Sequence, residues 1–298
     1  MKILLLGKGG QVGWELQRSL APLGELVALD FDSPGPLVAD FSDPESLATT
    51  VRAVAPQIIV NAAAHTAVDK AESEPELARR LNALAPGVLA REAAALGAWL
   101  VHYSTDYVFD GSGSTPWIED APTGPLSVYG RTKLEGEETI RGSGARHLIF
   151  RTSWVYAARG GNFAKTMLKL ARERDRLTVI DDQIGAPTGA DLLADITAHA
   201  VRTALQRPDV SGTYHAVNGG ETSWHGYASH VIAFARANGQ PIRVAPDAIV
   251  PVPTSAFPTP AKRPGNSRMN TTRLRDMFGL TLPSWQSGVD RMLTEVLG

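Results

Sequence analysis

Short apolar runs alternate with amphipathic segments along the first 180 residues of the chain. The apolar runs are continuous and do not alternate with polar residues, which is typical of strands that are covered on both faces. The expected strands are Ile3–Leu6, Leu26–Asp30, Ile58–Asn61, Trp99–Tyr103, Leu148–Phe150 and Leu177–Ile180. This order predicts an α/β fold with a doubly wound parallel sheet of the Rossmann type and crossover helices.

Two of the intervening segments, Gln11–Leu20 and Leu77–Leu96, carry apolar residues at helical spacing. Pro86 is expected to kink or split the second helix, because proline removes one helical hydrogen bond. Further along, Ala245–Pro264 is so rich in proline that we expect an extended, irregular segment there and no central strand. The change of pattern after about residue 211 indicates a smaller C-terminal domain beside the large one.

Composition excludes several classes of function. The chain has 29 basic and 31 acidic residues, so it lacks the basic surplus that is typical of nucleic-acid binding. It has no cysteine, which excludes disulfides, thiolate nucleophiles and cysteine-based zinc sites. No apolar run has the length of a membrane span, and the apolar start is too short for a signal peptide. We therefore expect a cytoplasmic protein without a nucleic-acid or membrane partner.

The segment GKGGQVG follows the first expected strand and opens the first expected helix, with Gly7, Gly10 and Gly13 in the spacing G-x-x-G-x-x-G. Glycine lets the backbone turn sharply and approach a diphosphate, and a helix N-terminus offers free N–H groups. Asp30 ends the second expected strand, where an acidic side chain usually accepts hydrogen bonds from the adenosine ribose. The plain alternative is a glycine-rich turn that binds no ligand.

Tyr129 and Lys133 are four residues apart, which places them on one face of a helix. An ammonium beside a phenol favours the phenolate and lowers the pKa of the tyrosine, as an acid–base group near neutral pH requires. The hydroxyl of Thr105, at the end of an earlier strand, is placed to hydrogen-bond the phenol and a reacting carbonyl. A Tyr-x-x-x-Lys pair alone occurs by chance in many helices. Together with the glycine loop and Asp30, it predicts a nicotinamide-dependent oxidoreductase.

These motifs resemble those of the extended short-chain dehydrogenase/reductase family. The resemblance covers essentially the whole chain, in strings such as GQVGWEL at 10–16, NAAAHTAVDKAESEPE at 61–76, HYSTDYVFDG at 102–111, VYGRTKLEGE at 128–137 and PTPAKRPGNSRMN at 258–270. It implies a reductase that converts the C4 keto group of dTDP-4-dehydro-6-deoxy-L-mannose to the alcohol with NADPH or NADH. The product would serve the synthesis of surface polysaccharide, such as the O-antigen of lipopolysaccharide.

The resemblance also implies roles for individual residues. Tyr129 would donate the proton, with Lys133 and Thr105 as its catalytic partners. The NAD(P)-binding residues would be Gly7, Gly10, Gln11, Val12, Gly13, Asp30, Asp40, Phe41, Ala64, His65, Thr66, Tyr129 and Lys133. The residues facing the deoxysugar would be Thr105, Asp106 and Trp154. One departure from the family pattern is Gly9, where a threonine-like residue is frequent.

Two observations bear on the preference for NADH or NADPH, and they point in different directions. The stretch that follows Asp30, Phe31-Asp32-Ser33-Pro34, holds no basic residue to neutralise the 2′-phosphate of NADPH, so the local sequence favours NADH. The resemblance implies that both cofactors work. We expect dual use, with Asp30 turning aside and a basic group such as Lys8 or Arg18 reaching the phosphate.

The implied NAD(P)-binding domain spans residues 1–152 with parts of 171–210 and 240–262. The implied substrate-binding domain is discontinuous and holds 153–170 and about 211–298. Most relatives work as dimers, so a homodimer is expected. Some relatives hold a divalent ion between acidic side chains at the subunit contact, which makes Mg²⁺ a further candidate cofactor, with Glu15, Asp191 and Glu295 as candidate ligands. No clustered ligand spacing supports such a site, so no metal ligand is assigned.

Two alternatives stay open. A related nucleotide-sugar epimerase would use the same tyrosine to shuttle protons without net consumption of the nicotinamide. A non-catalytic regulatory subunit would keep the Rossmann fold alone, and it would have no need for an intact Thr105, Tyr129 and Lys133.

Overall fold

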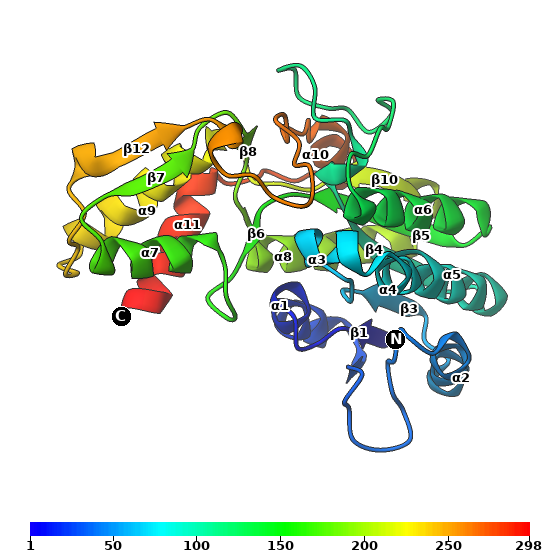
Figure 1. Cartoon of the computed structure of the whole chain (residues 1–298). Helices are drawn as coiled ribbons and strands as arrows, with labels where there is room; N and C mark the ends of the chain where they lie inside the picture. Colours follow the sequence, from blue (N-terminus) through cyan, green and yellow to red (C-terminus); the bar gives the residue numbers. More distant parts are fainter.

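The computed structural model describes all 298 residues of the chain. Its centre is a six-stranded sheet in the order β10-β5-β4-β3-β1-β2, and every neighbouring pair is parallel (Figure 1). The strands are β1 (Lys2–Leu6), β2 (Glu25–Leu29), β3 (Ile58–Asn61), β4 (Trp99–Thr105), β5 (Arg146–Thr152) and β10 (Gly212–His215). The order reverses between β1 and β3, which is where an open parallel sheet has its ligand-binding crevice.

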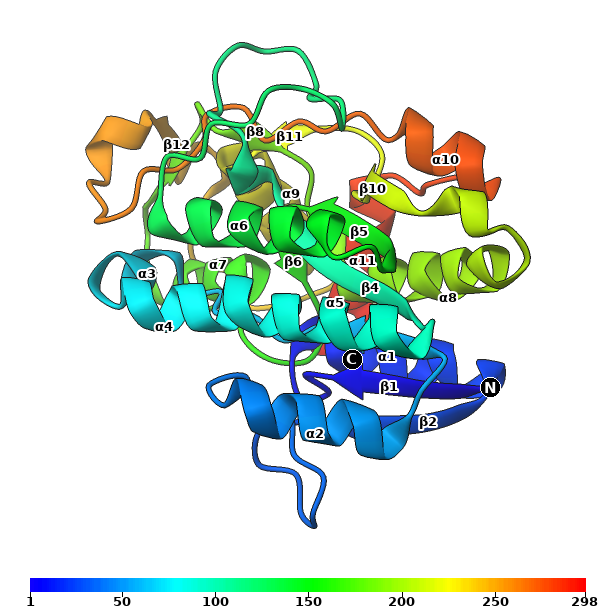
Figure 2. The same ribbon diagram turned by 90° about the vertical axis from the view of Figure 1, so that its right-hand side faces the viewer.

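Helices cover both faces of this sheet. Leu5 of β1 belongs to one apolar cluster, which also contains Leu16 of α1 (Gln11–Leu20) and Leu193 of α8 (Ala190–Gln206). Its neighbour Leu4 belongs to the cluster on the opposite face, which contains side chains of α2 (Pro44–Val54) and α5 (Ala85–Leu96). Figure 2 shows α2, α4–α5 and α6 (Val128–Gly142) side by side over that face. The doubly wound α/β fold is confirmed, and burial on both faces explains the unbroken apolar runs.

The expected helix Leu77–Leu96 is continuous but irregular. It begins at Pro75 as α4 (Pro75–Arg79), widens into a π turn over Arg80–Leu84, and continues as α5. Pro86 is the second residue after the π turn. A widened turn accommodates the missing N–H of a proline, because the helix there already departs from regular i→i−4 bonding. The predicted irregularity therefore occurs as a single π turn and not as a break.

A second layered body lies beside the sheet, on the left of Figure 1. It packs α7 (Phe163–Glu173), α9 (Trp224–Ala237) and α11 (Trp285–Leu297) around two apolar clusters. The expected strand Leu177–Ile180 forms as β7, but it pairs only with β12 (Ile249–Val252) in a separate two-stranded sheet. Because β12 belongs to the proline-rich segment and lies at an edge, the expectation of no central strand there is confirmed.

The remaining elements are short. They are β6 (Val155–Tyr156) paired with β9 (Thr188–Gly189), β8 (Ile184–Gly185) paired with β11 (Thr222–Ser223), the helices α3 (Val68–Ser73) and α10 (Thr272–Phe278), and single 3₁₀ turns at Ala21–Leu23, Asp106–Val108, Pro208–Val210, Pro246–Ala248 and Thr254–Ala256. Strand β10 lies within 211–298 and yet completes the central sheet beside β5. The division into two domains stays a prediction, and the chain crosses between the two bodies more than once.

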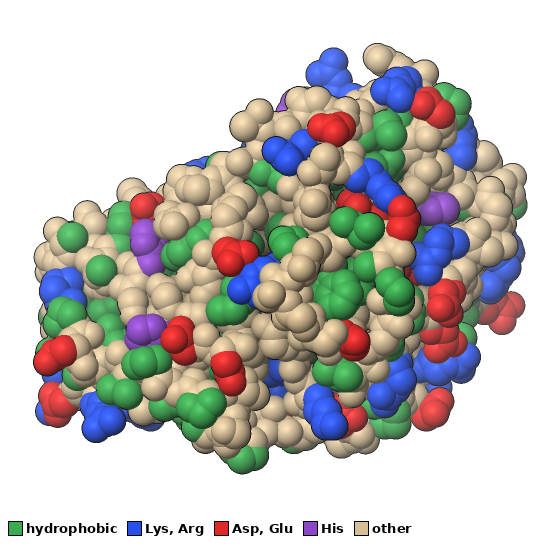
Figure 3. All heavy atoms as spheres, turned by 90° about the horizontal axis from the view of Figure 1, so that it is seen from above, with side chains coloured by type: hydrophobic (Ala, Val, Ile, Leu, Met, Phe, Trp, Pro, Cys, Tyr) green, Lys and Arg blue, Asp and Glu red, His purple; other side chains and the backbone are tan.

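None of the helices has the length and hydropathy needed to cross a membrane. On the face drawn in Figure 3, Lys and Arg side chains are intermixed with Asp and Glu, and no large patch of one sign covers it.

Candidate active site

A cavity of about 810 Å³ opens at the carboxyl ends of the central strands. Its walls come from the loops and strand ends that follow β1, β2, β3, β4 and β5, together with α6. This is the position at which open parallel sheets bind ligands. Every residue predicted for the site lines this cavity except Gly13 and His65. A pocket of this size falls within the range that holds cofactors together with small substrates.

The glycine loop packs so closely against the backbone around it that a side chain at Gly7 or Gly13 would clash. Gly7 has a φ of +86°, and a Cβ there would lie 2.7 Å from the backbone nitrogen of Ala63. A Cβ on Gly13 would lie 1.9 Å from the carbonyl oxygen of Gly7, so this glycine allows α1 to touch the loop and does not face the cavity. Helix α1 begins after Gly10 without a side-chain cap. Its first N–H groups are therefore available to an anion such as a diphosphate.

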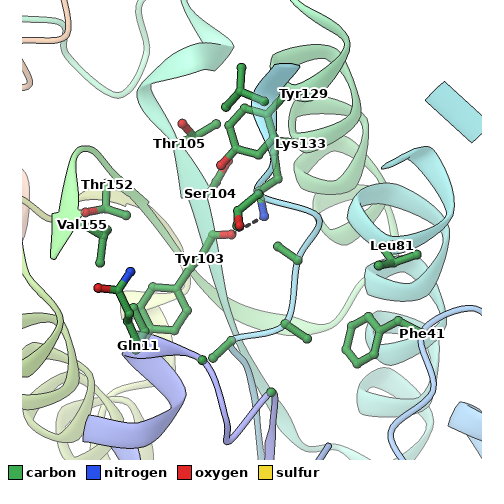
Figure 4. A pocket seen from close by; sticks show the side chains of 18 of the residues that line it. Gln11, Phe41, Leu81, Tyr103, Ser104, Thr105, Tyr129, Lys133, Thr152 and Val155 are labelled. Carbon is green, nitrogen blue, oxygen red and sulfur yellow. Dashed lines mark hydrogen bonds between the residues drawn. The ribbon is translucent and has the colours of Figure 1, made fainter. Parts of the chain in front are cut away.

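The Asp30 carboxylate lies beside this loop. Its Oδ2 accepts a hydrogen bond from Gly9 N (2.9 Å), and its Oδ1 accepts one from Phe31 N (3.2 Å). Asp40 also lines the cavity, but its Oδ1 is engaged by the backbone N (2.8 Å) and hydroxyl (2.6 Å) of Ser42. Phe41 and Leu81 lie close together on the wall of the cavity in Figure 4. An acceptor and an apolar wall are what a ribose and an adenine ring need.

The loop that follows β3 is tied to the opposite helix by Asn82. Its Oδ1 accepts from His65 N (2.8 Å), and its Nδ2 donates to His65 O (3.1 Å) and to Thr132 Oγ1 on α6 (3.2 Å). Ala64 and Thr66 line the cavity, whereas His65 does not. The side chain of His65 faces Glu74, with Nε2 3.7 Å from its carboxylate. Asn82 therefore holds the loop in place, and His65 contributes its backbone to that link.

Tyr129 and Lys133 project from α6 toward the end of β4 (Figure 4). Ser127 caps the start of helix α6, because its Oγ accepts a hydrogen bond from Gly130 N (3.2 Å). A Cβ on Gly130 would lie 2.3 Å from the carbonyl oxygen of Tyr107, so only glycine lets the helix approach the turn after β4 this closely. That approach places the phenol near Thr105. The expected grouping of the three catalytic candidates in one cavity is present.

Lys133 is buried, and it lines the cavity. Its Nζ donates to the carbonyl oxygen of Tyr103 at 2.6 Å and lies 3.4 Å from His102 Nε2. Burial lowers the pKa of Lys133 to about 8, and the carboxylate of Glu137 opposes this shift. Burial also lowers the pKa of His102 well below its usual value, with Lys133 adding to the effect, so the imidazole is neutral.

The pKa of Tyr129 is shifted in the direction opposite to the one expected from the sequence. Burial raises the pKa of Tyr129 to about 12, a hydrogen bond with the Thr105 side chain opposes the rise, and the charge of Asp106 adds to it. The prediction that Lys133 lowers the pKa of Tyr129 is wrong for this structure, because its ammonium is directed to the carbonyl of Tyr103. A phenol with a raised pKa stays protonated at neutral pH, which suits a proton donor.

Several buried polar atoms of the cavity wall have no partner within the protein. They are Gln11 Oε1, Ser104 Oγ, Asp106 Oδ2 and Thr152 Oγ1. Burial raises the pKa of Asp106 to about 6, and the hydroxyl of Thr105, which donates to Asp106 Oδ1 at 3.0 Å, opposes the rise. Unpaired buried polar groups cost free energy and call for a ligand or water to bond with them. A hydroxyl-rich ligand such as a nucleotide or a sugar fits this wall.

Trp154 lies on the wall of the cavity and also packs, partly buried, against an apolar cluster of the second body. It has a φ of +49°, a left-handed conformation that non-glycine residues seldom adopt. Its ring stacks on Trp224 of α9, with centroids 3.7 Å apart and planes 16° apart. Both tryptophans line the cavity. The second body thus reaches the site through an aromatic pair.

Sequence reasoning missed several lining residues, among them Phe31, Leu81, Tyr103, Ser104, Thr152 and Trp224. Tyr103 and Ser104 precede Thr105 directly, and their place at a strand end could have indicated them. Trp224 comes from a helix far along the chain, and no local pattern points to it.

The acidic candidates for Mg²⁺ gather elsewhere. Glu15, Asp191 and Glu295 line a second cavity of about 190 Å³ together with Arg18 and Arg291. Arg291 lies 2.7 Å from the Asp191 carboxylate and 3.6 Å from that of Glu295, and Arg18 lies 3.7 Å from that of Glu15. No group of three His, Cys, Asp or Glu side chains in the structure is arranged to hold a metal ion. No metal ligand is assigned.

Comparisons with known proteins agree with the motifs. The family model described as the RmlD substrate binding domain matches residues 1–297. The dTDP-4-dehydrorhamnose reductase of Salmonella typhimurium is 61% identical over 296 residues, which cover 99% of this chain and 98% of that protein.

Two solved structures share the fold. The dTDP-4-dehydrorhamnose reductase of Clostridium acetobutylicum has a TM-score of 0.88 at 34% identity and covers 100% of both chains. The enzyme of that name from Bacillus anthracis, solved in complex with NADP, has a TM-score of 0.86 at 32% identity and covers 99% of both chains. This chain belongs to the RmlD family, and the resemblance to extended short-chain dehydrogenases/reductases is confirmed.

Proposed function

We propose that this protein reduces the C4 keto group of dTDP-4-dehydro-6-deoxy-L-mannose (dTDP-4-dehydrorhamnose) to give dTDP-L-rhamnose, with NADPH or NADH as the reductant. The observation that carries the proposal is the grouping of Tyr129, Lys133 and Thr105 in one cavity whose wall holds unpartnered buried polar atoms. Full-length relatives that are dTDP-4-dehydrorhamnose reductases, at about 60% identity, support the same substrate.

The residues present fit a nicotinamide dinucleotide. The glycine loop and the uncapped start of α1 would hold the diphosphate, with Gly10, Gln11 and Val12 at the contact. Asp30, Asp40 and Phe41 would serve the adenosine end. Ala64 and Thr66 would serve the nicotinamide side, together with Tyr129 and Lys133. When bound, the reduced nicotinamide supplies a hydride to the carbonyl carbon of the sugar.

The chain supplies the proton. As the carbonyl carbon accepts the hydride and its C=O double bond becomes a single bond, the phenol of Tyr129 gives its proton to the developing alkoxide. Burial keeps this phenol protonated until that moment. Lys133 would bind the nicotinamide ribose with its ammonium and so position the cofactor beside Tyr129. The hydroxyl of Thr105 would orient the carbonyl oxygen toward the phenol.

The deoxysugar would lie between the end of β4 and the aromatic pair. Asp106 Oδ2, buried and without a partner, would accept a hydrogen bond from a sugar hydroxyl. Trp154, stacked on Trp224, would present a rigid aromatic surface that limits the position of the ring.

A reductase assay tests the proposal directly. Purified protein is given dTDP-4-dehydrorhamnose and NADPH or NADH, and the loss of reduced-nicotinamide absorbance is followed together with the formation of dTDP-L-rhamnose. We expect one nicotinamide oxidised for each sugar reduced. Isomerised sugar without net oxidation would instead indicate the epimerase, and binding without turnover would indicate the non-catalytic subunit.

The proposal also includes the use of the product, the location of the protein and its oligomeric state. The product would serve the synthesis of rhamnose-containing surface polysaccharide, such as O-antigen. A cytoplasmic location and a homodimer stay predictions, and sedimentation of the purified protein would test the latter.

A further inference from the structure

Two backbone N–H groups hold the Asp30 carboxylate, one at each oxygen. Gly9 N donates to Oδ2 at 2.9 Å, and Phe31 N donates to Oδ1 at 3.2 Å. The carboxylate is therefore held against the glycine loop, at the edge of the cavity where the cofactor's adenosine would lie. The expectation that Asp30 turns aside does not describe this arrangement.

Gly9 makes the arrangement possible. A Cβ on Gly9 would lie 2.7 Å from Asp30 Oδ2, which is shorter than real Cβ contacts. The clashing atom is the end of a side chain with rotatable bonds, and the next atom that the Cβ would meet is the Asp30 carboxyl carbon at 3.9 Å. A larger residue at position 9 would thus displace the carboxylate and leave the loop backbone in place.

The charges that line the cavity determine how the Asp30 carboxylate would affect the binding of the two cofactors. Lys133 is the one basic residue among the 29 that line the cavity, and it lies at the other end, beside Tyr103. Neither Lys8 nor Arg18 lines the cavity, and Arg18 is paired with Asp195 at 3.0 Å. No lining cation near Asp30 is thus available to offset the repulsion between its carboxylate and a 2′-phosphate.

We propose that Gly9 is a determinant of cofactor specificity, because it leaves room for Asp30 to be held where it accepts hydrogen bonds from the ribose hydroxyls of NAD(H) and repels the 2′-phosphate of NADP(H). The inference rests on the proposed function. It concerns the choice between the two cofactors and not the ability to reduce the sugar.

The test measures binding as well as activity. Dissociation constants for NAD⁺ and NADP⁺ are determined by calorimetry for the wild type, Gly9→Ala, Asp30→Ala and the double variant. Because Gly9→Ala would remove hydrogen bonds between the ribose and a charged group, we expect it to weaken NAD⁺ binding about tenfold or more. NADP⁺ binding stays equal or improves. Gly142→Ala is the matched control, since a Cβ there meets nothing within 4 Å.

The double variant distinguishes the effect of displacing the Asp30 carboxylate from a direct effect of Gly9→Ala on the glycine loop. If displacement of Asp30 is the cause, Gly9→Ala has no further effect on the ratio of the two dissociation constants once Asp30 is alanine. A shift of that ratio that persists in the Asp30→Ala background would overturn the inference. Equal losses for both nucleotides in Gly9→Ala would also overturn it, even with sugar reduction by the wild type intact. Failure of the wild type to bind either nucleotide would contradict the proposed function as well.

Discussion

The Lys133 ammonium and the carbonyl oxygen of Tyr103 are 2.6 Å apart, in a region closed to solvent. This hydrogen bond fixes the nitrogen at the end of β4, with the neutral imidazole of His102 3.4 Å away. This bond holds Lys133 one helical turn from Tyr129. The proposed contact of Lys133 with the nicotinamide ribose depends on that position.

Replacing Lys133 by alanine should reduce both the affinity for the cofactor and the turnover number, because the same ammonium is proposed to bind the nicotinamide ribose and to position it for the reaction. We expect losses of about tenfold or more in each, measured by steady-state kinetics and by titration with NADPH. Lys169→Ala, which removes an exposed lysine of α7, is the control. A loss of rate with an unchanged dissociation constant for NADPH would exclude the ribose contact.

The pH dependence follows from the same group. Burial lowers the pKa of Lys133 to about 8, so its ammonium is lost as the pH rises through that value. Tyr129, with its pKa raised to about 12, stays protonated over the same range. We therefore expect kcat/KM for the sugar to fall above about pH 8, and a profile that stays flat to pH 9.5 would contradict this assignment.

Tyr129→Phe removes only the hydroxyl and keeps the ring. General acid catalysis is worth about 10²–10⁴-fold, so turnover should fall by that factor while NADPH binding stays near normal. Tyr227→Phe is a matched control, since its hydroxyl is buried in the second body and has no partner. Activity above a tenth of the wild type would mean that another group protonates the sugar oxygen.

Asp106→Asn should raise stability at neutral pH. The pKa of Asp106 in the folded protein is about 6, above its ordinary value of 3.8, mainly because of burial. The carboxyl thus contributes stability below pH 3.8, and this contribution is lost as the pH rises through 6. In urea unfolding at pH 7.5, the variant should be more stable by on the order of 2 kcal/mol, and at pH 4 the difference should nearly vanish. An equal difference at both pH values would mean that the charge of Asp106 is not its cause.

Trp154→Ala should raise KM for the sugar nucleotide and leave cofactor binding unchanged, because the aromatic pair is proposed to face the sugar. Trp154→Gly is measured alongside it, since glycine adopts a φ of +49° without strain. If both variants unfold, as judged by circular dichroism, the tryptophan serves the core instead.

The fold was predictable where burial leaves a local pattern. Ile3–Leu6 and Ile58–Asn61 are apolar throughout because helices cover both faces of the sheet, and both strands form as expected. Leu177–Ile180 shows the limit of this reasoning. Its pattern indicates a strand, but its partner is a proline-rich segment about 70 residues later, and a pairing of that separation has no local signal.

The site was predictable where chemistry follows spacing. The glycine loop and the pair Tyr129 and Lys133 were located from spacing alone, and the structure brings them to one cavity. The pKa of Tyr129 was not predictable in direction, because it depends on how deeply the packed chain buries the phenol. The contact between Trp154 and Trp224 likewise arises only when the second body docks beside the sheet.

Because of the π turn at Arg80–Leu84, the directions in which the side chains of this helix point depend on the exact number of residues in the helix. Such a turn contains one residue more than regular helix geometry needs, which rotates the preceding segment by about 100°. Leu77, in the segment before the turn, and Leu81, within the turn, both line the cavity. We expect substitutions at exposed positions of this helix to be tolerated, whereas deletion of a single residue within it would turn part of the cavity wall away. Insertions and deletions here would thus damage the site without changing any residue that binds or reacts.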